Sequence, residues 1–159
     1  MRATRDRLLA FLRAHQVVTV AVVTDDRQPH AAALFYAVDD RLNLYVLTGP
    51  RTRHGRAMIA DGAVAGTVQR DRQHWREIQG VQFRGRCRRL RGRERAPAWN
   101  LYRARFPFLR SGPMALAAAL KRMALWRIEP DWMRLIDNRR GFGHQEECTF
   151  DIERRSGNG

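Results

Sequence analysis

The sequence predicts a mainly β domain with peripheral helices, an α+β chain built on an antiparallel meander. Three observations predict this class. Three short apolar segments follow one another with short polar turns between them, and the first of the three is rich in β-branched residues. Two later segments alternate in the same way, and each has a glycine inside it. Helical periodicity is confined to segments outside these strands.

The first half of the chain begins with an amphipathic helix, predicted over residues 4–15 because leucines and Phe11 recur among charged residues. Strands are expected over 17–24, 31–38 and 42–48, since aspartate-rich turns separate them. Gly49-Pro50 ends the third strand, and a short helix over 52–60 closes at Asp61-Gly62.

The second half continues the sheet with strands over 63–69 and 80–90. Gly66 and Gly85 within them predict bends of the kind that let a small barrel close. Helices are expected over 94–106 and 114–123, and residues 126–128 and 133–136 supply one or two last strands. Asp137-Asn138 before Gly141 predicts an ordinary turn, with a ligand loop as the alternative. Residues 1–153 are expected to form one domain, followed by a flexible tail over 154–159.

Composition limits the class of protein. Its 159 residues are 44% hydrophobic, which is enough for a core, and no apolar run approaches the roughly 18 residues of a membrane helix. Cys87, Cys148 and five scattered histidines make no zinc pattern, so no metal site is expected. Two lone cysteines fit a reducing compartment and a cytoplasmic protein, although one long-range disulfide stays open as an alternative. Cys87 itself reads as a small buried hydrophobe.

The net charge of +14 rests on arginine, because the only lysine is Lys121. Such a ratio points to a coding bias rather than selection for phosphate contacts. The densest stretch, Arg84–Arg95, holds seven arginines and one glutamate. A solvated strand face is the simpler interpretation of this stretch, and a surface for nucleic acid or another anion is the alternative.

Five short motifs occur in a characteristic order, and together they resemble the FMN-binding split-barrel superfamily of pyridoxamine 5'-phosphate oxidase, in particular its short YhbP-like branch. They are Thr52-Arg-His54, Val64-Ala-Gly-Thr-Val68, Gly80-Val-Gln-Phe-Arg-Gly85, Arg105-Phe-Pro107, and Ile136-Asp-Asn138 with Gly141-Phe-Gly143. The resemblance covers residues 5–145. It implies an antiparallel six-stranded split barrel that pairs as a homodimer, with FMN in the groove between the two subunits.

The resemblance also implies a phosphate site where the third strand ends near Thr48 and the next helix begins, at Thr52, Arg53 and His54. A helix N-terminus, a hydroxyl and a guanidinium make a suitable anion cradle. An ordinary N-capping Thr52 with a surface arginine and histidine is the alternative. The superfamily usually has a lysine where this chain has His54, and Arg51 and Arg56 are candidates to compensate.

Three further residues are candidates to contact the flavin. Phe35 and Tyr36 lie on a strand that faces the flavin in the superfamily, and core packing and cross-strand pairing are their alternatives. Gln82 alternates away from the apolar face of its strand, as any exposed strand glutamine would.

No Ser/His/Asp or Cys/His arrangement and no paired carboxylates indicate a protein-borne catalyst, so a cofactor would supply any chemistry. The chain also lacks the C-terminal Trp/Arg segment of true pyridoxamine phosphate oxidases, and that activity is not expected. The leading prediction is a flavin-dependent oxidoreductase of unknown substrate, with F420, haem or no cofactor as alternatives. A basic nucleic-acid-binding module on the same fold is the second hypothesis.

Four tryptophans and an alanine-rich helix over 114–123 supply more apolar surface than one small barrel should expose, which also predicts a homodimer.

Overall fold

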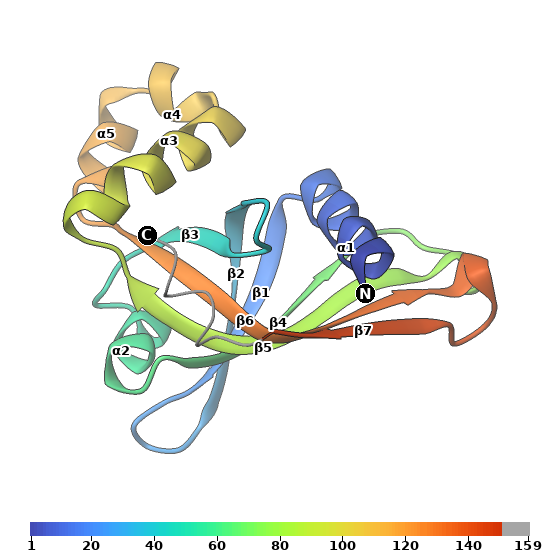
Figure 1. The fold of residues 1–159 in the computed structure, drawn as a ribbon. Coiled ribbons are helices and arrows are strands. Elements are labelled where there is room, and N and C mark those ends of the chain that lie inside the picture. The colour runs from blue at the N-terminus through green and yellow to red at the C-terminus, as the bar shows by residue number, and fades with distance from the viewer. Residues whose placement is uncertain (151–159) are drawn as a thin grey trace.

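A computed structural model describes residues 1–150, which form a closed six-stranded antiparallel barrel with a seventh strand outside it (Figure 1). The strands follow the order β3-β2-β1-β4-β5-β6-β7, and β3 pairs with β6 to close the barrel. The predicted six-stranded antiparallel barrel is confirmed. The strands are β1 (Val17–Val23), β2 (Pro29–Val38), β3 (Leu44–Thr48), β4 (Ala63–Gln69), β5 (Gln79–Arg89), β6 (Ala124–Asp137) and β7 (Gln145–Thr149).

The helices lie around this barrel. They are α1 (Arg2–Ala14), α2 (Arg53–Ala60), α3 (Arg95–Arg105), α4 (Phe108–Ser111) and α5 (Met114–Leu120), with short 3₁₀ turns at Trp75–Glu77, Gly92–Glu94 and Asn138–Arg140. Helices α3, α4 and α5 form a group beyond β3, at the upper left of Figure 1. Residues 154–159, where the sequence predicts a flexible tail, lie outside the described residues.

The two ends of the barrel are covered by different helices. Leu8 and Leu12 of α1 are fully buried and join the barrel core at the end where β1 begins. Met58 of α2 joins the same core at the other end, where the β1–β2 hairpin and the start of β4 lie. Burying these apolar stripes fixes each helix against the strands. We call the two ends the α1 end and the α2 end.

Alternation along the strands fills the barrel, as the sequence predicts. Val18, Val20 and Val22 of β1 point inward, and Cys87 of β5 is buried among other apolar side chains. Burial raises the pKa of the Cys87 thiol to about 12, which keeps it protonated at pH 7. Both Cys87 and Cys148 are free thiols.

The two strand glycines stand where other chain segments come very close. A Cβ on Gly85 would lie 2.2 Å from the Glu129 oxygen, and the register between β5 and β6 shifts at Arg84/Gly85. The predicted irregularity at Gly85 is therefore present. Gly66 keeps regular pairing with Phe83, whose ring a Cβ would meet at 2.4 Å, so Gly66 makes room for an aromatic side chain instead of a bulge.

Two element predictions, for the start of the third strand and for the end of the helix over 114–123, need correction. Leu42 has a positive φ of 66° and belongs to the turn, so β3 starts at Leu44. Where the sequence left one or two last strands open, the structure has a single strand, β6, which runs through Pro130. The sequence analysis missed β7 and α4, and the predicted helix over 114–123 ends at Leu120.

The outward side chains of β1, β2 and β4 include no Arg, Lys, Asp or Glu, although 29% of the chain is charged. We call this surface the uncharged face. Strand pairing places its residues side by side, for example Ala31 next to Ala21 and Ala21 next to Ala65. It consists of Val17, Thr19, Ala21, Val23, Pro29, Ala31, Ala33, Phe35, Ala63, Ala65, Thr67 and Gln69.

No helix within residues 1–150 is long and apolar enough to cross a membrane. The cytoplasmic location expected from the sequence stays a prediction.

Candidate functional site

The loop between β3 and α2 turns tightly and is held by Thr52, the N-cap residue of α2. Thr52 Oγ1 accepts a hydrogen bond from the Gly55 amide at 3.0 Å and donates one to the Gly49 carbonyl at 2.8 Å. A Cβ on Gly55 would lie 2.4 Å from the Gly49 oxygen, so only glycine fits there. Thr52 therefore has the capping role that the sequence analysis gave as the alternative.

Thr48 and His54 interact with each other at the base of this loop. Thr48 Oγ1 and His54 Nε2 are 2.7 Å apart, and both side chains are buried. The His54 ring stacks on His30 of β2, with 5.8 Å between centroids and 6° between planes. Burial lowers the pKa of His54 below 6.5, and the neighbouring His30 lowers it further. The shift favours the neutral ring, so His54 is a poor substitute for the fixed charge of a lysine.

The positive charge of the loop comes from Arg51, Arg53 and Arg56, which are all exposed. Within residues 1–150 none of the three makes an ion pair, although Arg56 Nη1 donates to the Arg51 carbonyl at 2.8 Å. Arg53 and Arg56 line a small hollow of about 220 Å³ together with Asp25 and Asp26 of the β1–β2 turn. These carboxylates are the nearest competitors for an anionic ligand.

The backbone adds donors to the same place. The amides of Arg53 and His54 are the first two of α2, and neither has an acceptor in the described part of the chain. Two free amides at the positive end of a helix, beside exposed guanidinium groups, fit a phosphate group. The loop therefore has donors that suit a phosphate or another compact anion.

Phe35 and Tyr36 point to opposite sides of β2. Tyr36 is 1% exposed, and its hydroxyl donates to the Leu12 carbonyl of α1 at 2.6 Å. Its ring therefore belongs to the core beneath α1 and not to a surface that a flavin ring can reach, which corrects the expectation for Tyr36. Phe35 is 47% exposed at the edge of the uncharged face, where its ring lies 5.3 Å from that of Phe106.

Gln82 points outward from β5, as the alternation predicts, and is half-buried. The strand register places it opposite Thr67, which lies opposite Thr19. This position is four residues along β4 from Ala63, the residue at the α2 end. Gln82 therefore lies several residues away from the α2 end along the sheet.

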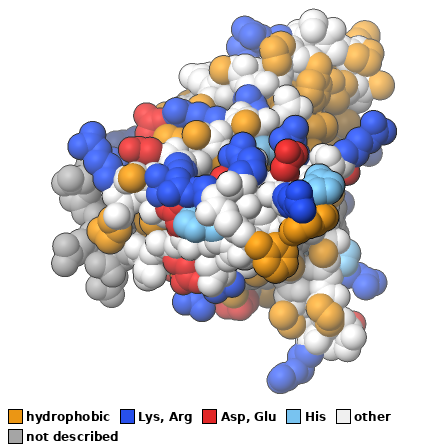
Figure 2. Space-filling model, turned by 90° about the vertical axis from the view of Figure 1, so that its right-hand side faces the viewer, with side chains coloured by type: hydrophobic (Ala, Val, Ile, Leu, Met, Phe, Trp, Pro, Cys, Tyr) orange, Lys and Arg blue, Asp and Glu red, His pale blue; other side chains and the backbone are white. Residues whose placement is uncertain are grey.

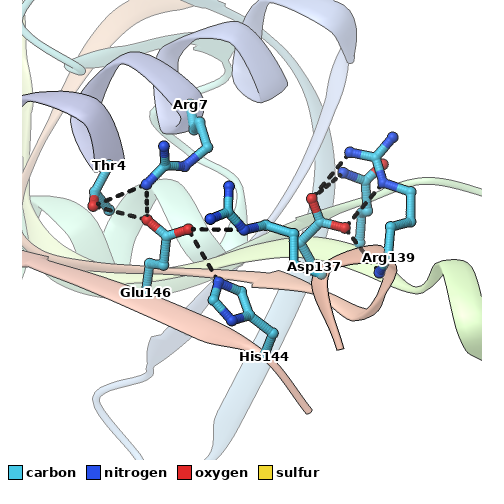
Figure 3. Close-up of polar contacts among 8 residues, drawn as sticks. Thr4, Arg7, Asp137, Arg139, His144 and Glu146 are labelled. Atoms are coloured by element: carbon cyan, nitrogen blue, oxygen red, sulfur yellow. Dashed lines mark hydrogen bonds and ion pairs between the residues drawn. The ribbon is translucent and has the colours of Figure 1, made fainter. Parts of the chain in front are cut away.

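A second polar cluster, which the sequence analysis missed, lies at the α1 end (Figure 3). Glu146 of β7 accepts hydrogen bonds from Arg7 and from Thr4, the latter at 2.8 Å, and pairs with His144 at 3.1 Å. Arg140 lies 3.8 Å from the same carboxylate. The hydrogen bond from Arg7 is the main reason that the pKa of Glu146 falls to about 2.

Asp137, at the end of β6, belongs to the same region of Figure 3. Its carboxylate accepts from Arg139 Nε and Nη2 at 3.0 Å each and from Gln79 Nε2 at 3.1 Å. The Arg139 amide also donates to it, as in the turn that the sequence predicts. The contacts with Arg139 hold the pKa of Asp137 below its usual value.

The arginine run lies on β5 and on the turn after it. Its outward members alternate, and three of them pair with carboxylates from other segments. Arg84 contacts Asp131 at 3.0 Å, Arg86 pairs with Asp61, and Arg88 binds both oxygens of Glu94. This part of the run is therefore a solvated strand face whose arginines are paired with carboxylates, as in the simpler of the two interpretations of the sequence.

Comparison with known proteins agrees with this architecture. The family model for pyridoxamine 5'-phosphate oxidase matches residues 4–137. The UPF0306 protein YhbP of Escherichia coli O157:H7 is 35% identical over 131 residues, which are 82% of this chain and 83% of that protein. The closed barrel and the match to this family model together define a split-barrel protein of the pyridoxamine 5'-phosphate oxidase type.

Two solved structures share the fold at low sequence identity. A heme binding protein from Mycobacterium smegmatis aligns with a TM-score of 0.73 and 17% identity, over 94% of this chain and 58% of that one. HutZ, the heme storage protein of Vibrio cholerae, aligns with a TM-score of 0.67 and 14% identity, over 91% of this chain and 92% of that one. The chain belongs to the pyridoxamine 5'-phosphate oxidase family, in the UPF0306 group with YhbP.

Proposed function

We propose that two copies of this chain form a homodimer that binds FMN and acts as a flavin-dependent oxidoreductase. The observation that carries the proposal is the β3–α2 loop, where free amides and unpaired guanidinium groups meet at the N-terminus of α2. FMN, when bound, supplies hydride and electron transfer. The residues of the chain bind and orient it, and Arg53 holds its phosphate.

The test compares FMN with riboflavin, which lacks the phosphate. Arg53→Ala should weaken FMN binding by at least about tenfold and leave riboflavin binding unchanged, because a charge-assisted contact to phosphate is lost. Asp26→Asn should strengthen FMN binding, since it removes a competing carboxylate from the hollow beside Arg53. Arg41→Ala, in the turn after β2, is the matched control. Equal losses for FMN and riboflavin would exclude Arg53 as the phosphate ligand.

The cofactor itself is tested by the absorbance spectrum of the purified protein and by titration with FMN, F420 and haem. Two relatives in fold are described as heme proteins, so haem is the main competitor. The loop favours FMN because its donors fit a compact phosphate, and because His54 Nε2 is already bonded to Thr48. A Soret band after loading with haem, and no flavin binding, would replace FMN by haem in this proposal.

The uncharged face supports the dimer. It is a large surface without charges on a chain of net charge +14, and pairing it about a twofold axis buries it without bringing like charges together. In a dimer formed through this face, Gln82 at its border and Phe35 at its edge lie beside the second subunit. They can then reach a ligand whose phosphate is held by the partner's loop.

Ala31→Glu tests this face, because Ala31 is exposed on it beside Ala21 of the central strand β1, and the new carboxylate would be desolvated in a dimer. Sedimentation at micromolar concentration should show a dimer for the parent protein and a shift toward monomer for the variant, together with weaker FMN binding. Ala3→Glu, on the exposed first turn of α1, should keep the dimer. A variant that stays fully dimeric would move the interface elsewhere.

Arg84, Arg86 and Arg88 are paired with carboxylates, so only the arginines after Arg88 in the run are available to bind a nucleic acid. Binding to single-stranded DNA that survives physiological salt, with a steep dependence on log[salt], would favour it. We retain flavin binding as the proposed function.

A further inference from the structure

A cleft of about 470 Å³ opens between α1 and the strands at the α1 end of the barrel, far from the β3–α2 loop. Arg7 and Phe11 line it from α1, and Leu135 and Asp137 line it from β6. The loops after β4 and β6 add Arg70 and Arg139 at its rim. Figure 2 views this side of the molecule and shows that Lys and Arg side chains are spread over it, with acidic ones among them.

The floor of the cleft is apolar. The side chains of Phe11 and Leu135 are packed in the core and present one surface to it. Ala10 and Ala14, one helical turn apart on α1, line the same wall, and their small size leaves the space open. A flat or compact apolar group can lie on such a floor, and its burial would favour binding.

The rim of the cleft carries one positive charge that the described residues do not compensate. Arg7 pairs with Glu146 and Arg139 pairs with Asp137, as Figure 3 shows. Arg70 has no hydrogen bond or ion pair within residues 1–150. Three guanidinium groups thus face two carboxylates.

The Arg7 side chain also has a hydrogen-bond donor without an acceptor. Its Nη2 is used by Glu146 and Thr4, whereas its Nε is buried and has no hydrogen-bond partner among the described residues. A buried N–H without an acceptor is unfavourable, and such groups in native proteins are generally satisfied by an ordered water or a ligand. This atom has no accessible surface in the observed position, so an acceptor oxygen in the cleft satisfies it only after the Arg7 side chain turns toward the cleft.

We propose that this cleft binds a small molecule with one anionic group, a carboxylate or a phosphate monoester, on an apolar or aromatic body. Arg70 and the free edges of Arg7 and Arg139 hold the anion, and the floor formed by Phe11 and Leu135 holds the body. The site is built within one chain, so it depends neither on FMN nor on the dimer.

Benzoate and phenyl phosphate are the probes, and calorimetric titration at low salt is the measurement. Benzyl alcohol serves as the neutral probe, and inorganic phosphate as the anion without an apolar body. Arg70→Gln removes the unpaired charge without breaking an internal contact, and Ala10→Trp fills the floor from an exposed helix position. Arg72→Gln, two residues along the same loop and outside the cleft, is the matched control. Thermal unfolding checks that each variant is folded.

Saturable binding of benzoate or phenyl phosphate, at least about tenfold tighter than benzyl alcohol and inorganic phosphate, is the expected result. Arg70→Gln and Ala10→Trp should each weaken it by about tenfold or more, and Arg72→Gln and Arg53→Ala should leave it unchanged. The tighter of the two probes identifies the class of anion. Absence of saturable binding, or equal losses in Arg70→Gln and Arg72→Gln, would overturn the proposal. Loss of flavin binding in Arg53→Ala would not bear on it.

Discussion

The carboxylate of Glu146 joins α1 to β7, and its replacement by glutamine gives a measurable pH signature. Its pKa in the folded protein is about 2, compared with 4.5 for an ordinary glutamate. A difference of this size corresponds to about 3 kcal/mol of stabilisation as an upper bound. The side chains of Glu146 and Arg7 are 13% and 36% exposed, so screening by water reduces the contribution to about 1–2 kcal/mol.

This stabilisation is present above pH 4.5 and is lost as the pH falls toward 2, because the folded state then takes up a proton at the cost of the ion pair. We expect Glu146→Gln to lower the free energy of unfolding by about 1–2 kcal/mol at pH 7, and the difference from the parent protein to disappear near pH 2. Urea unfolding, followed by tryptophan fluorescence between about pH 7 and pH 2, measures both quantities.

Glu147→Gln is the matched control, because Glu147 lies on the outer side of β7, contacts Arg134 and Trp132 there, and is more exposed to solvent than Glu146. Its replacement should change the stability little at any pH. A difference for Glu146→Gln that stays constant over the whole range, or an equal loss in Glu147→Gln, would refute the assignment of the low pKa to the contact with Arg7.

Two further predictions concern the packing of the barrel. Gly85→Ala should destabilise the protein by about 1–3 kcal/mol or more, since the new Cβ meets the Glu129 carbonyl at 2.2 Å, whereas Gly80→Ala on the same strand has 3.4 Å of room and should be nearly neutral. Chemical unfolding of the two variants compares them directly, and similar losses would contradict the crowding at Gly85. Tyr36→Phe should cost about 1–2 kcal/mol, because the Leu12 carbonyl loses a buried donor. Hydrogen exchange of the α1 amides should then rise, and unchanged protection would show that this bond does not hold the helix.

The fold was predictable where local pattern and tertiary role agree. Strand β4 has the predicted bounds 63–69, because its alternation is complete and a turn precedes it. For strand β6 the sequence leaves one or two strands open, because Pro130 interrupts its pattern. The structure accommodates Pro130 opposite Gly85, where the ladder is already irregular. Strand β7 gave no signal because Glu146 on its inner side is satisfied by α1 and not by apolar packing.

The position of the candidate site in the chain could be predicted from the sequence, but the contacts that its side chains make could not. A Gly-Pro turn followed by Thr52 marks a helix start, and the arginines next to it follow directly from the sequence. The lowered pKa of His54 could not be predicted from the sequence, because it depends on burial and on His30, which lies 24 positions earlier on another strand. Tyr36 and Phe35 are adjacent in sequence, so only the barrel closure decides which of them faces the core.

Arginine density along the chain is a poor guide to charge on the surface of this protein. The outward arginines of β5 lie next to carboxylates that come from β6, from the end of α2 and from the turn before α3, so alternation and pairing dilute the run. On β1, β2 and β4 the outward positions carry no charge at all. Two molecules of charge +14 repel one another, and the uncharged face is where they can meet without placing guanidinium groups together. A ligand that carries phosphate to the border of that face would add negative charge where two such molecules approach. Dimerisation and flavin binding should therefore strengthen each other, and FMN should raise the dimer fraction more than riboflavin does.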